Sequence, residues 1–172
     1  VSSVGVGRDS TWNNIIGGQS GASHIEAFDA AGWPTDFACE VKDFTLPAGS
    51  VDLDYRRYLN RPMSFGLAAA LEAMTDSEVE GCVDPYRFAV SVGSNIGALP
   101  ASFISAYLQA MHRQEHLPVK KLVGECRNRD ALKNHPGTLA GLLSMRWNAR
   151  GLPTTIQTAC ASSGQSLGHA FQ

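Results

Sequence analysis

The chain has 172 residues, with 14 Lys and Arg against 16 Asp and Glu, and a formal net charge of −2 at pH 7. Hydrophobic residues make up 44% of the chain and charged residues 17%, a composition that excludes a disordered protein and is typical of a globular one. The near-neutral charge argues against a nucleic-acid binder, which would be basic overall. Apolar stretches such as 67–71 fall far short of the ~20 residues that cross a membrane.

The first half of the chain predicts one helix, a long loop region and a second helix. A short helix is expected over 9–16, capped by Asp9-Ser10 and ended by Gly17-Gly18. Turn-forming residues and three prolines predict mostly loop over 19–62, with one short extended piece at 37–41. Apolar residues at helical spacing then predict a helix that begins at Ser64.

The second half predicts strands and helices in alternation. A turn at Asp84-Pro85 precedes a buried strand over 88–92, and residues 93–97 form a strand-to-helix turn. A helix begins near Pro100, a polar connection covers 117–136, and a second amphipathic helix covers 139–147. The β-branched segment 154–157 predicts another strand, followed by a helix-like tail to residue 172. This alternation predicts an α/β fold in one continuous unit.

Cysteine usage directs attention to Cys160. The four cysteines (Cys39, Cys82, Cys126 and Cys160) are too few and too widely spaced for a disulfide framework. The chain has no Cys-x-x-Cys pair, so the sequence gives little support for a structural zinc site. We therefore expect a reducing, cytoplasmic location. Cys160 falls among small residues where the predicted strand gives way to a helix. Small neighbours leave a thiol open to a substrate, and the positive end of a helix dipole favours the thiolate, which is the nucleophilic form. The alternative is a small buried hydrophobic residue, the usual place of a free cysteine.

The sequence around Cys160 resembles the nucleophile motif of the β-ketoacyl–acyl carrier protein synthases, the ketosynthases of fatty-acid and polyketide assembly. The resemblance rests on Thr-Ala-Cys-Ala-Ser-Ser at 158–163, Gly151 before it and Ser-Leu-Gly at 166–168 after it. Further segments agree in order along the whole chain: 1–5, Trp12, 17–21, 28–29, 40–44, 84–85 and 92–94. The chain departs from the family in reading Gly151-Leu152-Pro153 where Gly-Pro is usual, and in lacking the usual Arg-Met-Asp run within 56–64.

The resemblance implies the amino-terminal half of a thiolase-like fold, with a mixed sheet between helical layers, over residues 1–172. It implies that Cys160 takes an acyl group from the phosphopantetheine thioester of an acyl carrier protein, and that a decarboxylating malonyl thioester then attacks this group. The N–H of Cys160 would take part in the oxyanion hole, and no metal or redox cofactor is needed. Because the first strand and the half that supplies two histidines and a lysine are not in this sequence, we expect a fragment, or a chain that a second polypeptide completes.

The same resemblance implies partners and a pocket. The strand at 154–157 would pair with its copy or with a ketosynthase-like subunit across a twofold axis, giving a homodimer or heterodimer. Ser102 falls where relatives carry a bulky gate at the floor of the acyl pocket, and the partner subunit would complete that pocket near Asn134 and His135. A hydroxyl at Ser102 would leave room for longer acyl chains. A helix-capping role for Ser102 is equally open.

Three other interpretations of the sequence remain. A non-catalytic subunit comparable with a chain-length factor is one alternative. A zinc hydrolase is a remote one, because His112 and His116 fit an H-x-x-E-H pattern but lack a third ligand. Five basic against two acidic residues within 120–133 suggest either a solvated loop or a docking patch for an acidic carrier protein.

Overall fold

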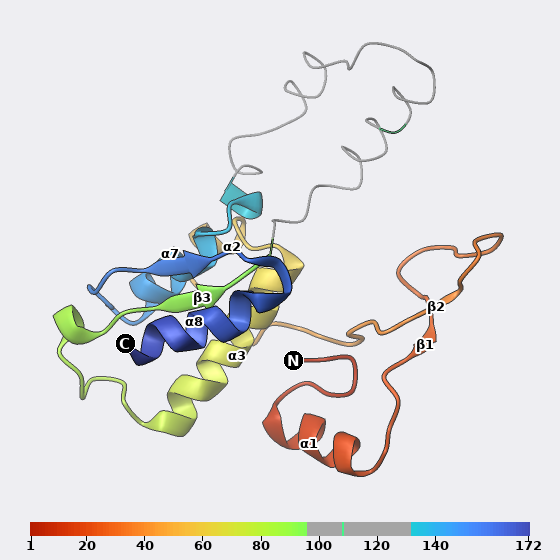
Figure 1. Cartoon of the computed structure of the whole chain (residues 1–172), viewed down its shortest axis with the longest axis horizontal. Coiled ribbons are helices and arrows are strands. Elements are labelled where there is room, and N and C mark those ends of the chain that lie inside the picture. The colour runs from red at the N-terminus through yellow and green to blue at the C-terminus, as the bar shows by residue number, and fades with distance from the viewer. Residues whose placement is uncertain (96–107, 109–131) are drawn as a thin grey trace. The chain divides into compact units, whose positions relative to one another are not determined.

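The computed structural model describes residues 1–95, 108 and 132–172 (Figure 1). Two compact units make up the chain. The first consists of Val1–Ser50 with Ser64–Glu78, and the second of Val51–Met63 with Val79–Gln172. Each unit is described below by itself.

A parallel pair of strands lies at the centre of the second unit. Strand β3 (Ser91–Gly93) pairs with β4 (Thr154–Ile156), with Ser91 opposite Thr154 and Gly93 opposite Ile156. Both predicted strands are therefore present and pair in parallel, which needs a long crossover connection between them. Nearly all of the helix predicted near Pro100 and most of the connection predicted over 117–136 lie outside the described residues. The strand expected over 88–92 begins three residues later than predicted. Phe88 directly follows the 3₁₀ turn η1 (Pro85–Arg87), and its carbonyl accepts a hydrogen bond from the N–H of Gly151 at 2.8 Å.

Helices cover this strand pair. Helix α8 (Ser162–Phe171) packs against both β3 and β4, and α7 (Thr138–Arg146) contacts β3. Figure 1 shows α8 in front of the strands and α7 behind them. Four residues of α7 are buried, at spacings that place them on one face: Leu139, Ala140, Leu142 and Leu143. The amphipathic helix predicted over 139–147 is therefore confirmed. A short helix, α2 (Leu53–Arg56), also belongs to this unit and was not predicted.

The first unit combines a helix, a hairpin and most of α3 (Arg61–Ser77). Strands β1 (Ser23–His24) and β2 (Phe37–Ala38) form the antiparallel hairpin. The extended piece expected over 37–41 is a strand only at 37–38, and β1 was not predicted. The aromatic rings of Phe44 and Phe65 meet edge to face, with their centroids 4.8 Å apart. Leu67 on α3 is only 1% exposed, so this face of the helix belongs to the core.

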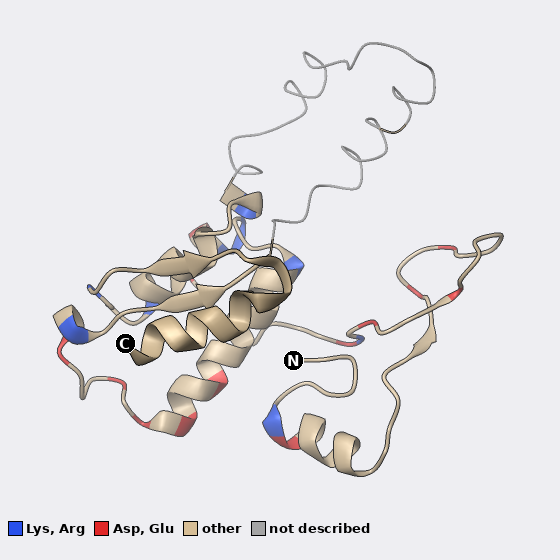
Figure 2. Ribbon diagram, in the orientation of Figure 1, with Lys and Arg blue, Asp and Glu red and all other residues tan. Residues whose placement is uncertain are grey.

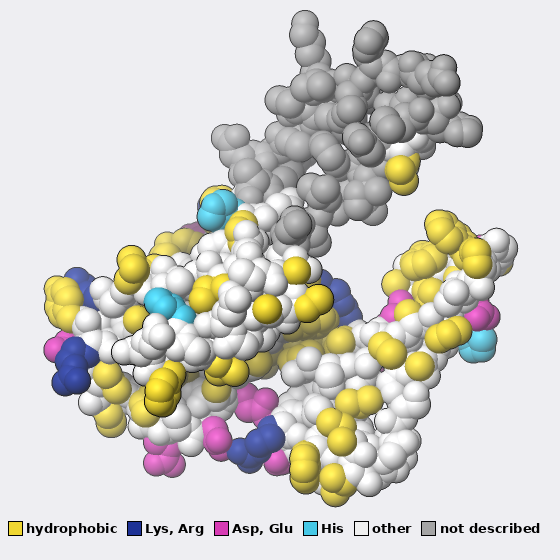
Figure 3. Space-filling model, in the orientation of Figure 1, with side chains coloured by type: hydrophobic (Ala, Val, Ile, Leu, Met, Phe, Trp, Pro, Cys, Tyr) yellow, Lys and Arg dark blue, Asp and Glu magenta, His cyan; other side chains and the backbone are white. Residues whose placement is uncertain are grey.

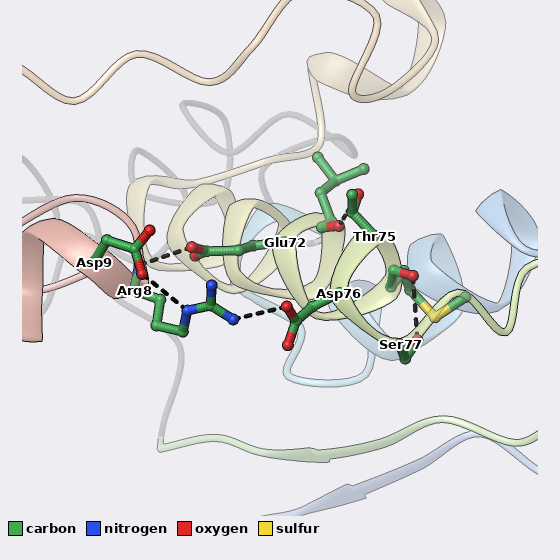
Figure 4. Close-up of polar contacts among 8 residues, drawn as sticks. Arg8, Asp9, Glu72, Thr75, Asp76 and Ser77 are labelled. Atoms are coloured by element: carbon green, nitrogen blue, oxygen red, sulfur yellow. Dashed lines mark hydrogen bonds and ion pairs between the residues drawn. The ribbon is translucent and has the colours of Figure 1, made fainter.

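Both helix starts predicted in the first half of the chain were wrong. Helix α1 (Arg8–Ile16) has Gly7 at its N-cap and no side-chain cap from Asp9 or Ser10. Its first N–H is instead satisfied by Glu72 on α3, whose Oε1 accepts from the N–H of Arg8 at 2.7 Å (Figure 4). Helix α3 begins at Arg61 and not at Ser64, because Asn60 Oδ1 accepts from the N–H of Met63 at 2.9 Å and acts as the cap.

Charged groups reinforce the contact between α1 and α3. Arg8 donates to Asp9 at 3.0 Å and to Asp76 at 2.7 Å (Figure 4). These hydrogen bonds, to Asp9 first and then to Asp76, raise the pKa of Arg8 above its usual value. The side chains are exposed, so these ion pairs contribute little to the stability of the unit.

Exposed hydrophobic side chains mark two parts of the surface. Figure 3 shows hydrophobic side chains gathered over the β1–β2 hairpin, where Phe28, Trp33 and Phe37 are each more than half exposed. On α8, Leu167 is 75% exposed and Phe171 is 94% exposed. Among the helices in the described ranges, none has the length and apolar character needed to cross a membrane.

The cap from Glu72 predicts a local change on mutation. Glu72→Ala in the intact protein should speed hydrogen exchange at the first-turn amides of α1 and lower the free energy of unfolding by about 1 kcal/mol, the usual value of a lost N-cap. Exchange followed by mass spectrometry checks the first effect and denaturant unfolding the second. Glu80→Ala removes an exposed carboxylate outside this contact and should leave exchange in α1 unchanged. Equal exchange rates in the two variants would contradict the assignment.

Candidate active site

Cys160 lies in the 3₁₀ turn η2 (Ala159–Ala161), between the end of β4 and the start of α8. Its thiol is free and the residue is exposed, so the alternative of a buried structural cysteine is wrong within this chain. The flanking Ala159 and Ala161 carry only methyl groups, which leave the sulfur accessible. The position predicted from the sequence, at a strand-to-helix turn among small residues, agrees with the structure.

The backbone immediately before Cys160 is strained. Ala159 adopts a φ of 50°, in the left-handed region that a residue with a Cβ rarely occupies. Such a conformation costs about 1–3 kcal/mol and persists only where the surrounding structure enforces it. The strained residue turns the chain sharply, so that Cys160 projects from the turn and does not continue the line of β4.

The side chain of Ser162 enforces this turn. Its hydroxyl accepts a hydrogen bond from the N–H of Thr158 at 2.8 Å and donates one to the carbonyl of Ala159, also at 2.8 Å. Ser162 is 3% exposed, so water does not compete strongly for either bond. One buried hydroxyl therefore links the two residues that precede the thiol to the first turn of α8.

Helix α8 approaches β3 more closely than a side chain would allow. A Cβ placed on Gly93 would lie 2.6 Å from the carbonyl oxygen of Ser162 and 2.7 Å from Cα of Ser163. One turn further along α8, the hydroxyl of Ser91 lies 2.8 Å from that of Ser166 and donates to the Ser166 carbonyl at 3.2 Å. A glycine and small hydroxyl residues thus form the contact surface between strand and helix.

The segment that carries the turn supplies a nucleophile without charged neighbours in the sequence. Residues 151–172 contain no Asp, Glu, Lys or Arg, and Figure 2 shows α8 and both strands without charged residues. The nearest imidazole along the sequence, His169, lies about 10 Å further along the axis of α8. This part of the chain supplies an exposed thiol and backbone N–H groups. It does not supply the acid or base that a full catalytic cycle would use.

The structure describes only some of the other predicted site residues. Ser102, His112 and His116 lie outside the described residues, as does the basic segment up to residue 131. Asn134 is half-buried, and His135 is exposed with its Nδ1 accepting from the N–H of Gly137 at 3.1 Å. That bond is local to the start of α7. The role of Asn134 and His135 in an acyl pocket stays a prediction.

Two features of the site were missed by sequence reasoning: the strain at Ala159 and the bridging hydroxyl of Ser162. The sequence did contain a signal for a third feature, the close approach of α8 to β3: Gly93 comes directly after the predicted strand, and a glycine there allows another backbone to approach closely. Within the ranges that the structure describes, no group of three His, Cys, Asp or Glu residues could hold a metal ion.

Comparison with known proteins assigns the family. All 172 residues match the family model described as "Beta-ketoacyl synthase, N-terminal domain". The chain is 31% identical over 172 residues to a putative polyketide beta-ketoacyl synthase 1 of Streptomyces cyaneus, and 32% identical over 175 residues to 3-oxoacyl-[acyl-carrier-protein] synthase 2 of Vibrio harveyi. These alignments include 99% of this chain but only 40% and 39% of the two relatives. The chain also matches a crystal structure of a beta-ketoacyl synthase from Burkholderia phymatum, with a TM-score of 0.74 and 21% identity. This match covers 99% of the present chain and 40% of the Burkholderia chain.

The chain belongs to the β-ketoacyl synthase family and corresponds to its N-terminal domain. The resemblance stated from the nucleophile motif is therefore confirmed, as is the thiolase-like α/β fold. The chain spans about 40% of the length of the curated relatives that it matches.

The close contact at Gly93 predicts a strong sensitivity to one added methyl group. Gly93→Ala would press a Cβ into the backbone of α8, and overpacking of this kind typically costs about 1–3 kcal/mol. We expect a lowered melting temperature, measured by calorimetry, and a displaced turn at Cys160, measured by a shift of the backbone amide resonance of Cys160.

Gly141 on α7 provides the matched control for this substitution. A Cβ there meets nothing within 4 Å, and a helical Gly→Ala change normally stabilises a protein by about 1 kcal/mol. If Gly93→Ala were as stable as Gly141→Ala, the contact between β3 and α8 would not be as close as described.

Proposed function

We propose that Cys160 is the acyl-carrying nucleophile of a β-ketoacyl–acyl carrier protein synthase. The observation that supports this most directly is the exposed thiol on a strained turn, fixed by Ser162, at the start of α8. A nucleophile in this place is open to a substrate, and strain that the fold enforces is typical of functional turns.

In the proposed first step the Cys160 thiolate attacks the carbonyl carbon of an acyl thioester on the phosphopantetheine arm of an acyl carrier protein. A carbon–sulfur bond forms, and the carbonyl oxygen becomes an oxyanion that the N–H of Cys160 helps to hold. The intermediate collapses, the carrier's sulfur leaves and takes up a proton, and the acyl group stays on Cys160. Since one thioester replaces another, the step is nearly balanced in free energy.

In the proposed second step a malonyl thioester on the carrier protein loses CO₂. The carbanion that results attacks the carbonyl carbon of the acyl-Cys160 thioester, a carbon–carbon bond forms, and the thiolate of Cys160 is released. The product is a β-ketoacyl thioester two carbons longer than the acyl group. The groups that bind malonate and transfer protons are expected from the part of the synthase that follows this domain. Neither step requires a metal or redox cofactor.

Two macromolecular partners belong to the proposal. The first is an acyl carrier protein, in keeping with the name of the Vibrio harveyi relative, a 3-oxoacyl-[acyl-carrier-protein] synthase. The second is a copy of the protein or a ketosynthase-like subunit. In the described residues β4 pairs with β3 alone, so an edge of β4 is open to strand pairing across a twofold axis. A non-catalytic subunit comparable with a chain-length factor is disfavoured because the nucleophile is kept.

The proposed function predicts that an acyl donor acylates one residue of the chain, Cys160. After incubation of the intact protein with an acyl–acyl carrier protein, mass spectrometry should find the acyl group on the peptide that contains Cys160. Cys160→Ala should abolish loading, because no other thiol occupies the turn. Cys39→Ala and Cys82→Ala also remove exposed thiols and serve as controls that should load normally. Acylation of the Cys160→Ala variant would refute the assignment.

A further inference from the structure

Ser162 controls the direction of the peptide bond between Ala159 and Cys160. Its hydroxyl donates to the carbonyl oxygen of Ala159 at 2.8 Å, and that oxygen belongs to the same peptide group as the N–H of Cys160. Because a peptide group is planar and trans, its C=O and N–H point in opposite directions. Holding the oxygen towards α8 therefore aims the Cys160 N–H away from α8.

The second hydrogen bond of Ser162 fixes the hydroxyl itself. The Oγ accepts from the N–H of Thr158 at 2.8 Å, so both its donor and an acceptor position are used within the turn. Ser162 is 3% exposed, and its backbone lies against Gly93 of β3. The hydroxyl that holds the Ala159–Cys160 peptide thus belongs to a residue packed against the strand pair, and it cannot rotate freely. This restraint maintains the left-handed φ of Ala159 against its intrinsic cost.

We infer that Ser162 is a positioning residue that aims the N–H of Cys160 at the oxyanion formed during acyl transfer. The inference rests on the proposed function, because it assigns Ser162 a role in the transition state of that reaction. The hydrogen bond to the Ala159 carbonyl also polarises the peptide, which strengthens its N–H as a donor. Ser162 itself does not touch the substrate.

The proposed role of Ser162 predicts different effects on acyl transfer to Cys160 and on alkylation of its thiol. Attack on a thioester builds negative charge on the carbonyl oxygen, whereas alkylation by iodoacetamide displaces iodide and forms no oxyanion. In the intact protein, Ser162→Ala should therefore slow acyl loading of Cys160 by about tenfold or more at saturating acyl donor, with little change in KM. Its rate of alkylation by iodoacetamide should stay close to that of the unaltered protein.

Two further variants complete the comparison. Ser163→Ala removes the neighbouring hydroxyl, which is exposed, and should load normally. Ser162→Thr keeps a hydroxyl and should recover most of the loading rate, whereas Ser162→Val has nearly the same shape without one and should not. If Ser162→Ala does not fold, the Thr and Val pair decides: equal loading rates in these two would overturn the inference.

The outcomes distinguish the two proposals. An unaltered protein that is alkylated but never acylated at Cys160 would refute the synthase function. In that case the backbone amide resonance of Cys160 still tests the placement of Ser162, because loss of the bond to Ala159 should shift it in Ser162→Ala and not in Ser162→Thr. A loading rate unchanged in Ser162→Ala, an equal loss of loading and alkylation, or an unmoved resonance would overturn the positioning role.

Discussion

The close approach of β3 to the first turn of α8 is the constraint on which the site depends. It is possible only because Gly93 has no side chain, since any Cβ would meet the backbone of Ser162 and Ser163 below 3 Å. The hydrogen bonds between Ser91 and Ser166 then continue the contact one turn further along the helix. Because α8 is fixed against the strand pair in this way, the turn that carries Cys160 has a defined position at the end of β4.

Strain and hydrogen bonding are combined at the same turn. Ala159 adopts a backbone conformation that is unfavourable for any residue except glycine, and the buried hydroxyl of Ser162 offsets this cost with two hydrogen bonds. A glycine at 159 would adopt the conformation more easily but would leave the chain freer to move. An alanine that is held in place keeps both the thiol and the adjoining peptide in one orientation, which is what attack on a carbonyl requires.

Hydrogen bonds to the first-turn N–H groups, local or distant, also decide where helices begin. Helix α1 has acidic and hydroxyl residues near its start that predict a local cap, yet the carboxylate of Glu72, 64 residues away, accepts from the N–H of Arg8. Helix α3 begins at Arg61, where Asn60 and Pro62 favour a start, although apolar spacing alone indicated Ser64. Periodicity reports the face that a helix buries. It reports the first turn poorly, because several donors and acceptors compete there.

The sequence by itself determined the α/β class and the place of Cys160 at a strand-to-helix turn, because these depend on local periodicity and on small residues close together in the chain. It also predicted a strand at 154–157 and a helix over 139–147, which the structure has at 154–156 and 138–146. The motif around Cys160 also determined the family. Only the tertiary structure decided which group caps α1, why Gly93 is needed and how Ser162 orients the peptide before the nucleophile. The first two are contacts between elements far apart in the chain: Gly93 indicates a close backbone approach but not which element makes it. The third depends on the backbone conformation of Ala159, which brings its carbonyl to the hydroxyl of Ser162 and which residue types alone do not specify.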